Sequence, residues 1–370
     1  MSKRYHLLKM LLVLMLGLRC AHADPLDDHV RDAMKKNNVP GAVTMVIRDG
    51  KVLKQQAYGL ASVELRVPSR ITDVYPLASV TKVFTATATL MLVQDGKLQL
   101  DEPISEVLPA LPAKWRALTV RQCLTHSTGL PDIFEDDSPV PIAWEQDELI
   151  EKLKSRPFTY EPGTRSRYEQ TDYVLLRMAV EQVTGETLPG FITRRILAPL
   201  GMASARYGDY RDVVPGRVAF YWRYPPAVDR THVLWANGKV VVSPDTLWNN
   251  PFFYATYDLG GVGLNMSILD LAKFDNALWQ GRLLHHPLLE EMAQPLILPG
   301  GRKAAFSLAW EVSSAKGDRL VYYDGAGAII YAHDLNTNTT LIVFTNCNGG
   351  HPSVIMDQLL RAYSPSGHLD

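Results

Sequence analysis

Apolar residues recur with a helical period in several stretches of the chain. Val30 and Met34 stand four residues apart in a charged segment, which predicts an amphipathic helix. A longer apolar-periodic run follows Ser79 and ends at Asp95-Gly96, a helix-stop signal. The pattern predicts helices over 26–38, 80–93, 268–278 and 356–363.

Strand-like runs lie near both ends of the chain. A hairpin is predicted where the charged turn 48–51 separates 43–47 from 52–58. A second is predicted within 233–242, around Asn237-Gly238. The last part of the chain predicts strands over 308–312, 320–323, 328–332 and 340–344.

The order of these predicted helices and strands along the chain indicates a single domain with an α+β fold. Strands lie at both ends, whereas residues 100–200 alternate short helices with proline-marked loops. We expect one antiparallel sheet built from both chain ends, with a mainly helical subdomain inserted. The sheet subdomain would take about 24–78 and 265–370, and the helical subdomain about 79–264, within one domain over 24–370.

The first 23 residues predict an export signal. Basic residues precede the apolar run 10–18, and Ala21-His22-Ala23 is an A-x-A cleavage site. Nine apolar residues are too few to cross roughly 30 Å of hydrocarbon, and a short membrane-associated helix is the alternative. Arg19 argues against lipidation of Cys20. We expect a bacterial protein that begins at Asp24, is periplasmic or secreted, and carries no membrane span after cleavage.

Composition narrows the function classes. The chain is 46% hydrophobic and 21% charged, with a net charge of −1, which is ordinary for a globular enzyme and disfavours nucleic acid as a partner. It contains no H-E-x-x-H or C-x-x-C motif, so no metal site is predicted. Cys123 and Cys347 are expected to be free thiols, with a disulfide as the alternative.

Ser79 and Lys82 form the first candidate for chemistry. At the start of a helix, a spacing of three puts both side chains on one face. A serine hydroxyl needs a neighbouring base, and a desolvated lysine can lose its proton near neutral pH. The alternative is that Ser79 only caps the helix. The same spacing at Ser313 to Lys316 runs into Gly317-Asp318 and predicts a turn.

Several further segments show a family resemblance. Leu77-Ala78-Ser79-Val80-Thr81-Lys82 resembles the nucleophile motif of serine β-lactamases and penicillin-binding proteins. Segments 95–103, 118–130, 199–202 and 260–263 fit the same family, in the expected order, over roughly residues 26 to 362. The chain looks most similar to the class C β-lactamase, D-aminopeptidase and family VIII esterase branch. The resemblance implies a β-lactamase/transpeptidase-like fold and an acyl-enzyme mechanism that needs no cofactor.

The resemblance also assigns a second motif, Tyr-x-Asn, to Tyr168-Glu169-Gln170. It makes Tyr168 the partner of Lys82 in proton transfer, because an ammonium favours the phenolate and the pair can share a proton. The alternative is a buried tyrosine with a satisfied hydroxyl. Gln170 departs from the family's asparagine by one methylene, which puts its contact with substrate in doubt.

The third motif, Lys-x-Gly or His-x-Gly, matches Tyr323-Asp324-Gly325. The resemblance implies that Tyr323 and Gly325 border the substrate, and that the backbone N–H groups of Ser79 and Ala326 form an oxyanion hole. Tyr323 brings a neutral phenol where a cation is common, and it can instead be an ordinary strand aromatic. A dinucleotide site at Gly325-Ala326-Gly327 is excluded, since Ile330 stands where its third glycine belongs.

These residues predict a serine hydrolase acting on a small-molecule ester or amide, with a carboxylesterase-like activity favoured. A β-lactamase or D-alanyl or D-amino-acid peptidase is the alternative among enzymes, and a non-catalytic ligand-binding or sensor domain is the alternative of another class. The aromatic-rich stretch 207–257 forms either a wall over the cleft or ordinary packing. The sequence does not predict an oligomeric state.

Overall fold

The computed structural model describes residues 24–133, 145–222, 247–249, 256–313, 315, 317, 319–365 and 367–369. The expected export signal, the expected hairpin at 233–242 and much of the aromatic-rich stretch lie outside these residues.

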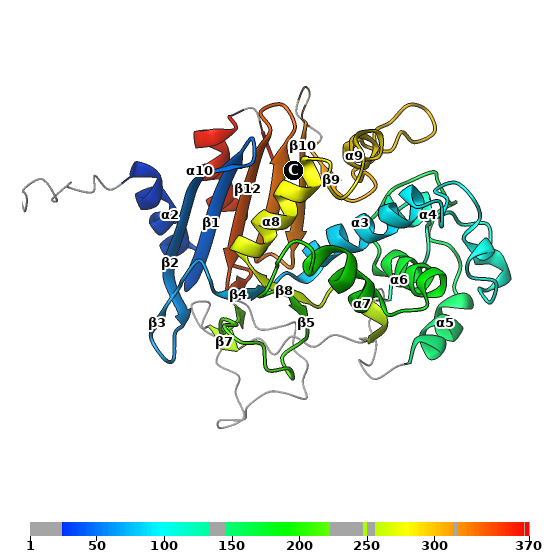
Figure 1. Ribbon diagram of the computed structural model, residues 1–370, viewed down its shortest axis with the longest axis horizontal. Coiled ribbons are helices and arrows are strands. Elements are labelled where there is room, and N and C mark those ends of the chain that lie inside the picture. The colour runs from blue at the N-terminus through cyan, green and yellow to red at the C-terminus, as the bar shows by residue number, and fades with distance from the viewer. Residues whose placement is uncertain are drawn as a thin grey trace, which may run out of the picture.

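One antiparallel sheet combines strands from both ends of the chain (Figure 1). Its seven strands run in the order β3-β2-β1-β12-β11-β10-β9, so the first and last parts of the chain meet where β1 pairs with β12. The strands are β1 Gly41–Arg48, β2 Lys51–Ser62, β3 Val67–Pro68, β9 Glu311–Val312, β10 Leu320–Gly325, β11 Ile329–Asp334 and β12 Thr339–Thr345. This arrangement confirms the predicted fold class.

Alternating side chains of the central strands pack into two hydrophobic cores, one on each face of the sheet. Ala42 and Val46 of β1 pack with α2 (Pro25–Lys36) and α10 (Ser353–Tyr363) on one face. The next residues in the alternation, Val43, Met45 and Ile47, pack on the opposite face, which α8 (Ile268–Trp279) covers (Figure 1). Since side chains alternate along a strand, two buried faces require apolar residues at nearly every position.

The helical region lies beside the sheet and is organised around α3 (Thr81–Gln94), with α6 and α7 packed against it (Figure 1). Twelve of the fourteen residues of α3 are buried, so this helix is a core element with no solvent face. The other helices here are α4 Val120–Leu124, α5 Gln146–Lys154, α6 Gln170–Thr184, α7 Leu188–Ile192 and α9 His286–Ala293. Single turns and a π-helical segment connect them: η1 Ala78–Val80, η2 Ile104–Glu106, η3 Ala113–Trp115, η4 Thr193–Leu197 and η5 Thr256–Asp258.

Two small three-stranded sheets lie outside the seven-stranded sheet. One orders β4 (Val74–Pro76), β8 (Leu264–Ser267) and β5 (Arg206–Tyr207), and the other orders β13 (Cys347–Asn348), β6 (Tyr221–Trp222) and β7 (Trp248–Asn249). The β4–β8 pairing is antiparallel, and Leu77 N–H donates to the Leu264 carbonyl at 2.8 Å just beyond it. This pairing brings the residues after β4 beside those before β8.

Several element boundaries differ from expectation, among them those of a late strand and of the last helix. The predicted strand 308–312 is reduced to Glu311–Val312, because the Ser307 hydroxyl accepts from Trp310 N–H at 3.1 Å and closes a turn. The final helix begins at Ser353 and not at 356.

Cys123 and Cys347 are both buried, and the structure joins neither of them in a disulfide, as expected. Across the described residues, no helix has the length and apolar character needed to cross a membrane. The same part of the chain holds no group of three or more His, Cys, Asp or Glu side chains placed to bind a metal ion.

Candidate active site

Ser79 lies in η1, one turn before α3, on the edge between sheet and helices. The N-cap of α3 is Val80, and no side chain caps that helix end. Ser79 therefore does not serve as the cap. Its side chain is partly exposed, and its Oγ accepts a hydrogen bond from the Tyr168 hydroxyl at 2.8 Å.

Lys82 lies one helical turn further along and is fully buried. Its Nζ donates to the Gly261 carbonyl at 3.2 Å and lies 4.8 Å from the centroid of the Tyr168 ring. Burial lowers the pKa of Lys82 to about 8, because the charged form loses its hydration. The carboxyl groups of Asp258, Asp132, Asp172 and Glu311 oppose this effect in their ionised form.

Tyr168 carries a neutral phenol in this arrangement. Burial raises its pKa well above the usual value, and the hydrogen bond to Ser79 opposes that rise only in part. Of these two side chains, Lys82 therefore has the pKa nearer to neutral.

Gly261 fills the space between three polar groups. A Cβ added there would lie 2.7 Å from Gln170 Oε1 and 2.9 Å from both Asp258 Oδ1 and Lys82 Nζ. Glycine is needed because any side chain would displace the lysine or its neighbours. Both oxygens are buried, and neither has a hydrogen-bond partner among the described residues.

Asp258 is a site residue that the sequence reasoning missed. It is buried beside Lys82, and burial raises its pKa to about 7 while the positive charge of Lys82 opposes the rise. Its position two residues before Gly260-Gly261 was the only signal in the sequence. Gln170, which was predicted, lies in the same cluster, and its backbone N–H donates to Asp132 Oδ2 at 3.2 Å.

The end of β10 lies close to the segment that carries Ser79. A Cβ on Gly325 would lie 2.5 Å from the Leu77 carbonyl oxygen, so the glycine permits contact between the strand and η1. Ala326 follows with φ of 54° and is exposed, and Ala78, directly before Ser79, has φ of 45°. This left-handed conformation raises the conformational energy of non-glycine residues, and such strain concentrates at functional sites.

Tyr323, two residues earlier on β10, is buried and does not reach solvent freely. Its side chain is 1% exposed, and its hydroxyl lies 3.4 Å from His126 Nε2. The structure therefore gathers Ser79, Lys82 and Tyr168 around one point, with Gln170 beside the lysine and the β10 end opposite.

The family model described as Beta-lactamase matches residues 26–364. This chain belongs to the β-lactamase family. The resemblance seen in its motifs is thereby confirmed.

Three known proteins are similar to this chain in sequence or in structure. The chain is 27% identical over 299 residues to penicillin-binding protein 4* of Bacillus subtilis, covering 79% of this chain and 64% of that protein. An octameric penicillin-binding protein homologue from Pyrococcus abyssi has a TM-score of 0.73 at 25% identity, with 91% of this chain and 76% of that chain covered. D-amino acid amidase from Ochrobactrum anthropi SV3, complexed with L-phenylalanine, has a TM-score of 0.73 at 25% identity, with 92% and 99% covered.

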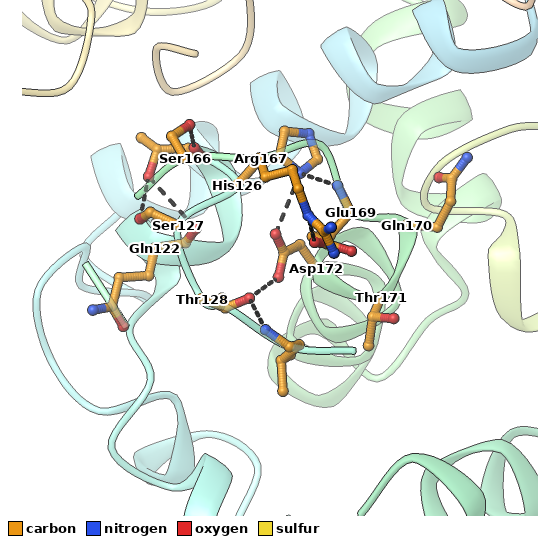
Figure 2. A network of polar contacts seen from close by, with 12 residues as sticks. Gln122, His126, Ser127, Thr128, Ser166, Arg167, Glu169, Gln170, Thr171 and Asp172 are labelled. Carbon is orange, nitrogen blue, oxygen red and sulfur yellow. Dashed lines mark hydrogen bonds and ion pairs between the residues drawn. The ribbon is translucent and has the colours of Figure 1, made fainter. Parts of the chain in front are cut away.

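A buried polar network adjoins the family motifs (Figure 2). His126, in the segment that carried part of the family resemblance, packs its ring 4.9 Å from that of Tyr168. Its Nδ1 lies 3.2 Å from Asp172 Oδ2, and Thr128 donates to the other oxygen of the same carboxyl group. The sequence reasoning gave neither His126 nor Asp172 a role, since their contact joins residues 46 positions apart.

Proposed function

We propose that this protein is a serine hydrolase that forms an acyl-enzyme on Ser79. The observation that carries the proposal is the 2.8 Å hydrogen bond from Tyr168 to Ser79 Oγ, with a buried lysine directly behind the tyrosine. A buried lysine with a lowered pKa can take up a proton that the serine must lose. Intact Ser79, Lys82 and Tyr168 favour an enzyme over a non-catalytic sensor domain.

The proposed reaction begins with attack of Ser79 Oγ on the carbonyl carbon of an ester or amide. The serine proton passes to the Tyr168–Lys82 unit, and the backbone N–H groups of Ser79 and Ala326 stabilise the tetrahedral oxyanion. The unit then protonates the leaving group as the carbon–heteroatom bond breaks. Water attacks the acyl-enzyme, releases a carboxylic acid and restores the serine hydroxyl. The reaction needs no cofactor.

We further propose that simple esters are better substrates than β-lactams. Most β-lactams carry a carboxylate, and Tyr323 offers no positive charge where the family commonly has a cation. A charge-assisted hydrogen bond contributes roughly 1.5–3 kcal/mol against roughly 1 for a neutral one. The deficit corresponds to roughly 5–30-fold weaker recognition. Gln170 and Gly325 would border the acyl side of the substrate.

The carboxylates around Lys82 support the same preference. Asp258, Asp132 and Glu311 each act on its charge. A substrate carboxylate placed among them would be repelled. The amidase similarity keeps a D-amino-acid peptidase or amidase as the second candidate, because such a substrate need not bring a carboxylate to this position.

Two measurements test the proposal. A fluorophosphonate probe should label wild-type protein stoichiometrically and fail to label Ser79→Ala; an unlabelled wild type contradicts the serine mechanism. The ratio of kcat/KM for a p-nitrophenyl ester and a chromogenic cephalosporin should favour the ester, and Tyr323→Lys should move the ratio toward the cephalosporin. Efficient cephalosporin turnover with negligible ester turnover would refute the preference.

We also propose that residues 1–23 direct export and are removed. The proposal rests on the basic residues, the apolar run 10–18 and the A-x-A site 21–23 of the sequence. Asp24 caps α2, since its side chain accepts from Leu26 N–H at 3.0 Å. The intact mass of periplasmic material should match a chain starting at Asp24. A mass that includes Met1, or a lipid on Cys20, would contradict this.

A further inference from the structure

His126 occupies a fully buried position beside the proposed catalytic tyrosine. Its exposed fraction is 0% and its φ is 51°, in the left-handed region that few non-glycine residues adopt. Its carbonyl oxygen accepts from Arg167 N–H at 2.8 Å and from the Tyr160 hydroxyl at 3.1 Å. These bonds fix the backbone and hold the imidazole against Tyr168.

The hydrogen bonds of the ring determine which nitrogen carries the proton. The backbone N–H of Glu169 donates to Nδ1 at 3.2 Å (Figure 2). A backbone N–H can only donate, so Nδ1 must accept. Burial lowers the pKa of His126 well below its usual value, which keeps the ring neutral. The single ring proton therefore resides on Nε2.

Asp172 fits this assignment. Thr128 Oγ1 accepts from Leu130 N–H at 3.1 Å, so its own proton points to Asp172 Oδ1. Asp172 Oδ2 lies 3.2 Å from His126 Nδ1. Burial raises the pKa of Asp172 well above its usual value, so the neutral acid is favoured. Protonated at Oδ2, it can donate to Nδ1, whose one lone pair it then shares with the Glu169 N–H, and this contact is compatible with the same tautomer.

The Nε2 proton faces β10. Nε2 lies 3.4 Å from the Tyr323 hydroxyl, a long contact. A hydrogen bond with Tyr168 is one of the causes that raise the pKa of Tyr323, after burial. A hydroxyl that accepts from His126 has one proton left to donate, and Tyr168 is the acceptor in reach.

We propose that His126 and Tyr323 are positioning residues that hold and polarise Tyr168, through hydrogen bonds running from Asp172 by way of His126 and Tyr323 to the Tyr168 oxygen. The proposal rests on the serine hydrolase function and deepens it. It gives the Tyr323 hydroxyl a role behind Tyr168; the proposed ester preference concerns only the lack of a positive charge at this position.

The consequence lies in the chemical step. When Tyr168 passes its proton toward Lys82, negative charge develops on its oxygen, and a hydrogen bond donated by Tyr323 stabilises that charge most in the transition state. Loss of this series of hydrogen bonds should therefore lower kcat and leave KM nearly unchanged.

A double-mutant cycle tests this series of hydrogen bonds. It compares kcat and KM of full-length variants on a p-nitrophenyl ester. Tyr323→Phe removes only the hydroxyl and should lower kcat roughly 10–100-fold, with KM within about twofold of wild type. His126→Met should have a similar effect alone and almost none in the Tyr323→Phe background. His126→Gln, which keeps an N–H donor at a similar reach, should recover much of the loss. Melting temperature and stoichiometric fluorophosphonate labelling establish that each variant is folded.

The outcomes separate this inference from the proposed function. Absence of labelling in wild type refutes the serine hydrolase itself. Normal labelling with additive losses in the cycle, or losses confined to KM, overturns the positioning chain alone. If the His126 variants do not fold, nitrogen-15 NMR of the wild-type imidazole decides the matter: an Nε2-protonated ring supports the chain, and an Nδ1-protonated ring overturns it.

Discussion

Two buried polar clusters in this protein contain the same kinds of side chain. The candidate active site combines a carboxyl group, a histidine and tyrosines with Ser79. A second cluster lies between α8 and the sheet, where Asp275 Oδ1 accepts from Tyr331 at 2.9 Å and from Thr340 at 2.8 Å. His333 Nδ1 lies 2.7 Å from the same threonine hydroxyl.

The pKa values do not distinguish the two clusters. Burial raises the pKa of Asp258 in the first and of Asp275 in the second to about 7. The partners differ. Hydrogen bonds alone oppose the shift at Asp275, whereas the charge of buried Lys82 opposes it at Asp258. Asp258 Oδ1 also lacks a hydrogen-bond partner among the described residues.

This contrast shows that a perturbed carboxyl pKa is not by itself a mark of catalysis. A cluster whose hydrogen bonds are satisfied internally stabilises a packed interface. The first cluster instead contains a buried cation, acceptors without a hydrogen-bond partner among the described residues, and a partly exposed serine that directly follows a left-handed residue. Substitutions in each cluster should therefore have different consequences.

The largest difference is expected for the nucleophile. Ser79→Ala should lower ester hydrolysis by a factor on the order of 10⁴ or more, because no acyl-enzyme can form. The matched control is Ser313→Ala, where the hydroxyl accepts from Ala315 N–H at 3.4 Å in a turn after β9. This control should change kcat/KM little; equal losses in both variants would remove the basis for the assignment.

A smaller loss is expected for the proton carriers. Lys82→Met and Tyr168→Phe should each reduce kcat about 10³-fold, and the double variant should be scarcely worse, because both residues serve one proton transfer. Steady-state kinetics on the three variants gives the comparison. If the logarithmic losses add, the two side chains do not share a proton.

A shift in pH dependence should separate the two buried carboxyl groups. The negative charge of Asp258 favours the lysine ammonium, so Asp258→Asn should lower the pKa of Lys82 further. The acid limb of kcat/KM, which reports the basic form of Lys82 in the free enzyme, should then move to lower pH by roughly one unit. Asp275→Asn should leave the limb in place. Movement in both variants, or a shift to higher pH, speaks against Asp258 as the charge partner.

The smallest effect on activity is expected in the second cluster, where the readout is stability. Burial raises the pKa of Asp275 to about 7 in the folded chain, against about 3.9 in an unfolded one. The stabilisation from binding this proton is complete below the unfolded value and is lost as pH rises through the folded value. Asp275→Asn carries no such proton, and its amide oxygen can still accept from Tyr331 and Thr340.

Relative to wild type, Asp275→Asn should therefore gain roughly 2–3 kcal/mol in unfolding free energy between pH 5 and pH 8. Urea denaturation at the two pH values measures the change, and kcat/KM should stay within about twofold. A constant difference between the two proteins would show that Asp275 is not protonated in the fold.

Local pattern was enough to predict the main elements. Apolar runs bounded by turn residues predicted the strands. Their position at both chain ends predicted one sheet, in which β1 and β12 pair. Ser79 and Lys82 were found because three residues of helix put two side chains on one face, a relation fixed by local geometry. Tyr168, Gln170, Tyr323, Gly325 and Ala326 were found through a family resemblance, since no local rule joins them to Ser79.

Tertiary structure alone decided the surroundings of these residues. The β4–β8 pairing brings Asp258 and Gly261 to Lys82, and the contact of His126 with Asp172 spans 46 positions. Periodicity reports the burial of a residue relative to its neighbours in sequence, and carries no information about which distant side chain will meet it. The charge state of a buried lysine, carboxyl group or histidine depends on those distant partners, and so could not be predicted from the sequence.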